Sequence, residues 1–236
     1  MKIVQDIMTK NPCYVAGKKI TVKGLMLHSV GCPQPSATVF ITSWNRADYN
    51  RACVHAFIDG NTGTVHQTLP WNHRGWHCGG SANNTHIGIE MCEPSTTDKA
   101  KAKAMVQRTY DTSVALFAHL CAKFALDPMT DIISHSEGYR KDVASNHSDP
   151  EHLWKQLGMG YTMDTFRKAV KSAMHYKVKI LVSTLNVRKG ASVTHPIVTT
   201  VRKGEIYTIV GESNGWGKLK SGAGWINLKY TEKVKG

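Results

Sequence analysis

Apolar residues recur with two different spacings along the first 174 residues of the chain. Short apolar or alternating runs bounded by Gly, Asn or Asp predict β-strands. Longer stretches with apolar residues three and four positions apart predict helices. The predicted strands are Val22–His28, Cys53–Ile58, Thr64–Gln67, His86–Met91 and Ile132–Ser134, and the predicted helices are Ser36–Tyr49, Asp98–Leu126 and Asp164–Met174.

The order of these elements predicts an α/β fold. Strands separated by helices favour a mixed central β-sheet flanked by helices. Asp59–Gly63 has the Asn and Gly residues of a hairpin turn and joins two of the predicted strands. Met1–Lys19 is expected to be an irregular lead-in, because Asn11–Pro12 and Gly17 interrupt it.

The pattern changes after His175. Short strand-like runs separated by Gly, Asn and Ser follow one another, and no run is long enough to predict more than one turn of helix. These runs are Val178–Val187, Ile206–Val210, Trp216–Leu219 and Gly224–Ile226. A segment of this size, made of short strand-like runs separated by turn residues, predicts a small all-β barrel. We therefore divide the chain into one domain of residues 1–174 and a second of residues 175–236.

Positive charge is concentrated in the second domain. The formal net charge is +13, and from Tyr176 onward eleven Lys and Arg stand against three Glu, a net charge of about +8. Such a domain is attracted to polyanions, including nucleic acid, anionic membranes and the teichoic-acid-bearing wall of Gram-positive bacteria. It has no helix to enter a groove and no aromatic-rich RNA-binding signature, and the chain has no membrane-spanning run. We therefore expect neither nucleic acid nor a membrane as partner.

The cysteines indicate a protein made in a reducing compartment. Six cysteines are scattered along the chain without CxxC spacing, so we expect mostly reduced, small core residues. Met1–Ile20 lacks an uninterrupted apolar core, so no secretory signal peptide is predicted. A substrate outside the cell would therefore require a separate route of release.

The run His135–Pro150 carries the clearest candidate chemistry. It offers two imidazoles, His135 and His147, and one carboxylate, Asp149, in a short segment expected to be loop-like. A further imidazole, His28, ends a predicted strand. Histidines with one carboxylate and no required thiolate fit catalytic zinc with an open coordination position better than structural zinc.

Five motifs occur in a fixed order along the first domain. They are His28, His55–Phe57 with Asp59–Gly63, Trp76–Gly79, Ile87–Glu90, and His135 with Asp149–Pro150. Together, over about Ile20 to Trp154, they resemble the type-2 N-acetylmuramoyl-L-alanine amidases, relatives of the peptidoglycan-recognition proteins. The resemblance implies a zinc enzyme that uses activated water to hydrolyse the amide between N-acetylmuramic acid and L-alanine. Some relatives only bind peptidoglycan, so a non-catalytic recognition protein is the alternative.

The resemblance also implies roles for single residues. His28 and His135 match the two histidine ligands, and Asp149 matches the third ligand of one branch, with His147 as its rival. Val54 stands where another branch has a catalytic tyrosine, which leaves Glu90 as the expected catalytic acid–base group. His147, two residues before Asp149, falls where relatives carry a catalytic cationic or polar residue, and His77 is the alternative donor to the oxyanion.

The remaining expectations concern substrate and docking. Trp76 and His77 are expected to line the substrate cleft, with core packing as the alternative for each. The motifs Leu185–Gly190 and Gly224–Ile226 resemble a bacterial SH3-type wall-binding domain. The pairing resembles a phage or prophage endolysin that acts on Gram-positive peptidoglycan. The resemblance implies synthesis in the host cytoplasm and release through a separate holin-type pore; the residues that grip the wall and the oligomeric state stay open.

Overall fold

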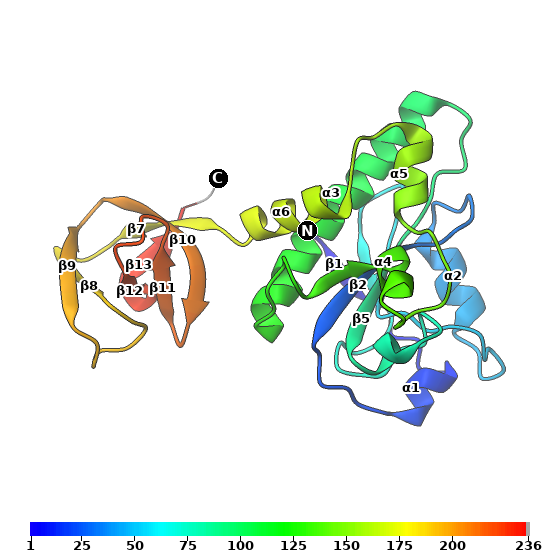
Figure 1. Ribbon diagram of the computed structural model, residues 1–236, viewed down its shortest axis with the longest axis horizontal. Helices are drawn as coiled ribbons and strands as arrows, with labels where there is room; N and C mark the ends of the chain where they lie inside the picture. Colours follow the sequence, from blue (N-terminus) through cyan, green and yellow to red (C-terminus); the bar gives the residue numbers. More distant parts are fainter. Residues whose placement is uncertain (235–236) are drawn as a thin grey trace. The chain divides into compact units, whose positions relative to one another are not determined.

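The computed structural model describes residues 1–234 and divides into two compact units, Met1–Val170 and Lys171–Gly236, whose last two residues lie outside the described part. The first unit contains a six-stranded sheet in the order β1-β4-β3-β5-β2-β6. Figure 1 labels β1, β2 and β5 of this sheet and the helices around it. All neighbouring strands run parallel except β3 and β4. The strands are β1 (Ile3–Gln5), β2 (Gly24–Ser29), β3 (Ala56–Ile58), β4 (Val65–Gln67), β5 (His86–Met91) and β6 (Ile132–Ser134).

Helices pack against this sheet and confirm the predicted α/β class. The longest, α3, contacts β3 and β5, and α4 contacts β2 and β6. Residues of α2 pack on Phe57 of β3 and on Cys92, just after β5. The helices are α1 (Pro12–Ala16), α2 (Ala37–Trp44), α3 (Lys99–Phe124), α4 (His135–Arg140), α5 (Glu151–Leu157) and α6 (Met163–Ala173), and a 3₁₀ turn, η1, covers Ser81–Asn84.

Local sequence explains where the longest helix begins and ends. The Asp98 side chain accepts hydrogen bonds from the backbone N–H groups of Ala100 and Lys101, which have no partner within the helix. Ala125 leaves the helix in the left-handed conformation, with φ of 55°, shortly before Asp127–Pro128. The helix predicted over Asp98–Leu126 is therefore confirmed.

Two predictions for the first domain are wrong. Met1–Lys19 is not an irregular lead-in: β1 pairs with β4 at the sheet edge, and Asn11 caps α1 by accepting a hydrogen bond from the backbone of Cys13. The segment that begins at His135 is not all loop, because its first six residues form α4. The Ser134 hydroxyl accepts from the backbone of Glu137, and the Glu137 carboxylate accepts from the backbone of Ser134. This reciprocal cap makes His135 the first residue of the helix.

The second unit is all-β, as predicted. Its seven antiparallel strands follow the order β13-β7-β10-β11-β12-β8-β9 around a core that includes Val187, Ile209 and Ile226. The run predicted over Val178–Val187 is two strands. The segments Ile197–Arg202 and Thr231–Lys233, for which no strand was predicted, form two more. The strands are β7 (Tyr176–Ile180), β8 (Thr184–Arg188), β9 (Ile197–Arg202), β10 (Ile206–Ser213), β11 (Trp216–Leu219), β12 (Trp225–Asn227) and β13 (Thr231–Lys233), with a 3₁₀ turn, η2, at Leu228–Tyr230.

The cysteines agree with the expectation of mostly free, buried residues. All six thiols are free; four are buried, Cys13 is partly buried and Cys32 is exposed. Over residues 1–234, none of the helices combines the length and the apolar character that crossing a bilayer requires.

Candidate metal centre

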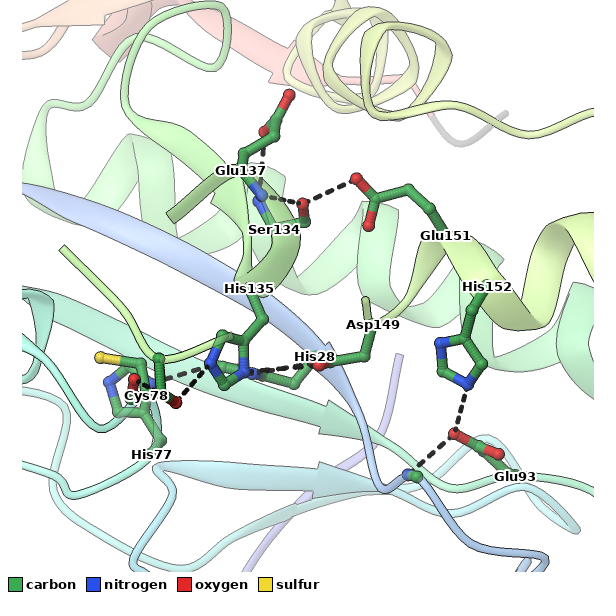
Figure 2. Close-up of polar contacts among 12 residues, drawn as sticks. His28, His77, Cys78, Glu93, Ser134, His135, Glu137, Asp149, Glu151 and His152 are labelled. Atoms are coloured by element: carbon green, nitrogen blue, oxygen red, sulfur yellow. Dashed lines mark hydrogen bonds and ion pairs between the residues drawn. The ribbon is translucent and has the colours of Figure 1, made fainter. Parts of the chain in front are cut away.

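Three side chains from distant parts of the chain converge in the first unit. His28 Nδ1 lies 3.1 Å from His135 Nδ1 and 3.1 Å from Asp149 Oδ2, and His135 Nδ1 lies 3.4 Å from Asp149 Oδ1 (Figure 2). All three residues are buried. Within residues 1–234 they form the only group of three or more His, Cys, Asp or Glu whose donor atoms are close enough to share one metal ion.

The parallel strands explain this convergence. His28 is near the carboxyl end of β2, and His135 immediately follows β6, its neighbour in the sheet. Leu27 pairs with Ser134, so the next residues, His28 and His135, lie side by side where the two neighbouring strands end. Asp149 joins them from the segment before α5. The carboxyl ends of neighbouring parallel strands are a common place for functional side chains.

The donor set fits a tetrahedral metal. Ligands about 2.0–2.1 Å from a zinc ion lie about 3.3 Å apart at the corners of a tetrahedron, close to the separations of 3.1–3.4 Å between these donors. Two imidazoles and one carboxylate are the protein ligands typical of catalytic zinc, which keeps a fourth position open. The residues can therefore hold a divalent metal of this kind.

The electrostatics of the three donors favour a cation between them. Burial alone would raise the pKa of Asp149, but the close approach of its carboxylate to His135 and His28 outweighs burial and holds that pKa well below its usual range. Burial lowers the pKa of His28 despite the nearby Asp149 carboxylate. A neutral imidazole beside an ionised carboxylate is the protonation state that metal binding requires.

His147 occupies a different place from Asp149. Its ring lies against that of His135, with centroids 4.5 Å apart and planes inclined by 30°, and it lines the cleft beside the three donors. It does not belong to the group that shares donor atoms. The structure thus brings Asp149, and not its rival, to both histidines.

Glu90 faces the same cleft. It pairs with His28 in the parallel register of β5 and β2, so both side chains leave the sheet on one face. Its Oε2 atom is shielded from solvent and has no hydrogen-bond partner among the described residues. Burial raises the pKa of Glu90 well above its usual range, and the charges of Asp149 and Glu93 add to the effect. An unpaired, hard-to-ionise carboxyl in a cleft is typical of an acid–base group.

The cleft has a volume of about 620 Å³. Trp76 lines it and is 46% exposed, so its ring is free to contact a ligand. His77 lies deeper: its Nδ1 is 3.0 Å from His28 Nε2, and its Nε2 is 3.1 Å from the backbone oxygen of His86. Both ring nitrogens of His77 are therefore engaged within the protein.

Sequence reasoning missed several residues in and around the cleft. Ser145, which lines it, lies 3.3 Å from His135 Nε2. The Glu93 carboxylate contacts two lining residues: it accepts a hydrogen bond from the backbone of Gly31 and lies 3.9 Å from His152. Arg51 also lines the cleft. Only Glu93 had a signal in the sequence, since it follows the predicted strand that ends at Met91; the others become visible only once distant loops are brought together.

Comparison with known protein families assigns both units. Residues 18–152 match the family of N-acetylmuramoyl-L-alanine amidases. Residues 183–232 match the bacterial SH3 domain family. The first match covers more than half of the chain and contains all three converging donors and Glu90.

Individual relatives agree with these family matches. A stretch of 54 residues is 46% identical to the N-acetylmuramoyl-L-alanine amidase XlyA of Bacillus subtilis (strain 168), and covers 22% of this chain and 18% of that protein. The fold resembles Staphylococcus aureus hydrolase AmiA, with a TM-score of 0.61 and 20% identity over 74% of this chain and 83% of that one. It also resembles the catalytic domain of XlyA, with a TM-score of 0.52 and 24% identity over 72% and 99% of the two chains.

Proposed function

The chain belongs to the N-acetylmuramoyl-L-alanine amidase family, and on this basis we propose that it hydrolyses the amide between N-acetylmuramic acid and L-alanine in bacterial peptidoglycan. The observation that carries the proposal is the convergence of His28, His135 and Asp149 beside the unpaired carboxyl of Glu90. Zinc is the metal that this donor set suits best.

His28, His135 and Asp149 would hold the zinc ion through the two Nδ1 atoms and a carboxylate oxygen. A zinc ion in such a site lowers the pKa of water from about 16 towards about 7 and polarises a carbonyl group. The two histidines and the aspartate supply a net charge of −1, which leaves the centre positive enough to attract the carbonyl oxygen of the substrate. The buried position of all three ligands keeps that charge from being screened by solvent.

Glu90 would act as the general base and then the general acid. A carboxylate accepts the proton of the attacking water and passes it to the nitrogen of the leaving L-alanine, which must depart as a neutral amine. The raised pKa of Glu90 suits the first transfer, because a carboxylate with a raised pKa is a stronger base towards the attacking water. The Oε2 atom of Glu90 has no hydrogen-bond partner among the described residues, so no hydrogen bond within the protein has to break before this atom accepts a proton.

His147 and Trp76 would contact the substrate. The His147 ring lines the cleft against His135, where its N–H can donate to the oxygen that becomes negative as water attacks the carbonyl. Trp76 offers an exposed aromatic face at the cleft, which suits the apolar face of a sugar ring. The cleft is thus suited to a glycopeptide with the scissile amide near the metal.

The second unit would attach the enzyme to its insoluble substrate. Its family match is a bacterial SH3 domain, and its net charge of about +8 attracts anionic polymers of a Gram-positive wall. In an endolysin, the protein would be made in the host cytoplasm and reach the wall through a separate holin-type pore. The amidase unit would then work on wall that the second unit keeps close.

Metal removal and restoration test this function. Stripping the protein with a chelator should abolish clearing of a cell-wall suspension, and adding one equivalent of Zn²⁺ should restore it. Mg²⁺, which prefers six oxygen ligands, should not. Clearing that survives complete removal of zinc would contradict the proposal. An intact wall under the zinc-loaded protein would instead favour a recognition protein without activity.

A further inference from the structure

We propose that His77 and Cys78 orient both histidine ligands through Nε2, the ring nitrogen of each ligand that does not face the metal site. The His77 ring would act through His28, and the backbone carbonyl of Cys78 would act through Ser145 on His135. His77 would then be a positioning residue and would not contact the substrate. The inference rests on the proposed function, because it assumes that His28 and His135 hold a metal.

The first chain of hydrogen bonds runs from His28 through His77 to the backbone oxygen of His86, with each donor fixed by the next acceptor. The backbone oxygen of His86 can only accept, so His77 Nε2, 3.1 Å away, carries the proton that it donates. A neutral His77 then has a bare Nδ1, which accepts from His28 Nε2 at 3.0 Å. His28 therefore carries its proton on Nε2 and presents the lone pair of Nδ1 to Asp149 and His135. A metal ligand needs this tautomer.

The second chain of hydrogen bonds, from His135 through Ser145 to the backbone oxygen of Cys78, has the same direction of donation. The Ser145 hydroxyl donates to the carbonyl oxygen of Cys78 at 3.1 Å, which leaves its own oxygen free to accept. His135 Nε2 lies 3.3 Å from that hydroxyl and donates to it, so the lone pair of His135 Nδ1 also faces the metal site. The backbone N–H of Ser145 donates to the same carbonyl at 2.7 Å and fixes the position of the hydroxyl. Both chains of hydrogen bonds thus end on backbone carbonyls, those of His86 and Cys78. Figure 2 shows His77 and Cys78 beside His28 and His135.

The residues around His77 leave room for its ring in one position only. A Cβ atom on Gly88 would lie 2.4 Å from His77 Cγ, so this position of β5 admits only glycine without displacing the ring. The Asn83 side-chain oxygen accepts from the backbone N–H groups of both His77 and Cys78, at 2.8 and 3.2 Å. The strand on one side and the η1 turn on the other therefore fix the ring and the carbonyl together. Such outer contacts commonly change metal affinity by about 10- to 100-fold.

Zinc affinity of matched variants tests the proposal. His77→Phe keeps a ring of similar size but removes the acceptor, and should weaken Zn²⁺ binding by about 10- to 100-fold in competition with a chromophoric chelator. His77→Asn places an amide oxygen near the position of Nδ1 and should recover most of the lost affinity. Ser145→Ala should weaken binding in the same direction, and Ser145→Thr, which keeps the hydroxyl, should not.

His66→Phe is the control for the substitution itself. His66 is a half-buried histidine of β4 that hydrogen-bonds Asp6 at 2.7 Å, and it has no contact with the three donors. This variant should bind Zn²⁺ as the wild type does. Equal affinities of wild type and His77→Phe would overturn the inference but leave the proposed function standing. Failure of the wild type to bind Zn²⁺ would overturn both.

The imidazole tautomers of the zinc-loaded wild type give a second test, which does not depend on whether a variant folds. Long-range ¹H–¹⁵N spectra should find the protons of His28, His77 and His135 on Nε2. His77→Asn should keep the Nε2 proton of His28, because the acceptor is preserved. A proton on Nδ1 of His28 or His77 would overturn the inference.

Discussion

Two carboxyl groups in one cleft, Asp149 and Glu90, have opposite tendencies to ionise, and this difference fits the separate roles that we propose for them. The two neighbouring histidines lower the pKa of Asp149. Burial raises the pKa of Glu90, whose Oε2 atom has no hydrogen-bond partner within residues 1–234. Environments that push the pKa values of neighbouring acids apart are typical of sites in which one group holds a charge and the other moves a proton. Asp149 is suited to ligation and Glu90 to proton transfer.

Replacing Glu90 should therefore separate chemistry from metal binding. Glu90→Gln keeps the size of the side chain but removes its ability to accept a proton. We expect activity to fall by about 10²- to 10⁴-fold while zinc content stays at one per chain. Zinc analysis of the purified variant and the initial rate of wall clearing provide the two measurements. Unchanged clearing would remove Glu90 from the mechanism.

Asp149 and His147 should respond to substitution in different ways. Asp149→Asn removes the charged ligand and should weaken zinc binding, because the donor group includes Asp149. His147→Asn should leave zinc bound and lower the rate by on the order of a hundredfold, as loss of one donor to an oxyanion does. Zinc dissociation constants and rates at saturating zinc distinguish the two effects. The reverse pattern would make His147 the third ligand.

The strands of the site were more predictable than the segments that complete it. His28 and Glu90 end apolar runs, so their places followed from hydrophobic pattern and the family resemblance. The segment after Ser134 was predicted as loop, although Ser134 and Glu137 have the spacing of a helix cap. The contacts of Ser145 and His77 could not be predicted, because they depend on how loops far apart in the sequence fold against the sheet.

His55, which is buried and hydrogen-bonds both His73 and Gly88, should make the free energy of unfolding of the first unit fall at acidic pH. Burial lowers the pKa of His55 to about 4. Its Nε2 donates to the His73 carbonyl and its Nδ1 accepts from the Gly88 backbone, so a second proton would break the latter bond. The unfolded chain takes up that proton below about pH 6.5, so the folded state should lose up to about 3 kcal/mol between pH 6.5 and pH 4.

The free energy of unfolding of metal-free protein, measured across this pH range, checks the role of His55. His55→Asn should be less stable than the wild type near neutral pH but should lose less stability on acidification. Metal-free samples are required, because release of zinc at low pH would add its own effect. Parallel curves for the two proteins would show that His55 does not contribute to acid sensitivity.

Under the proposed function, the division of the whole molecule into an amidase unit and a basic all-β unit would separate hydrolysis from docking. Most of the net positive charge, about +8 of +13, lies from Tyr176 onward, whereas the three metal donors and Glu90 lie in the first unit. Charge-driven docking is long-ranged and weakens as salt screens it. Hydrolysis at a buried centre depends much less on bulk salt.

Adsorption to purified walls should therefore depend on ionic strength. Raising salt from about 0.05 M to about 0.5 M should lower the fraction of the full chain bound to walls, because the screening length falls to a few ångströms. Hydrolysis of a small soluble muramoyl peptide should change little. A chain that ends at residue 174 is the control and should adsorb poorly at either salt concentration. Adsorption of the full chain that is independent of salt would rule out docking by charge.

The identity of the bond cut is the decisive measurement. Walls digested with zinc-loaded protein should show new amino-terminal L-alanine and no new reducing sugar ends, and neither chelated protein nor Glu90→Gln should release comparable amounts. New reducing ends, or new peptide amino termini other than L-alanine, would contradict a zinc amidase centred on His28, His135 and Asp149.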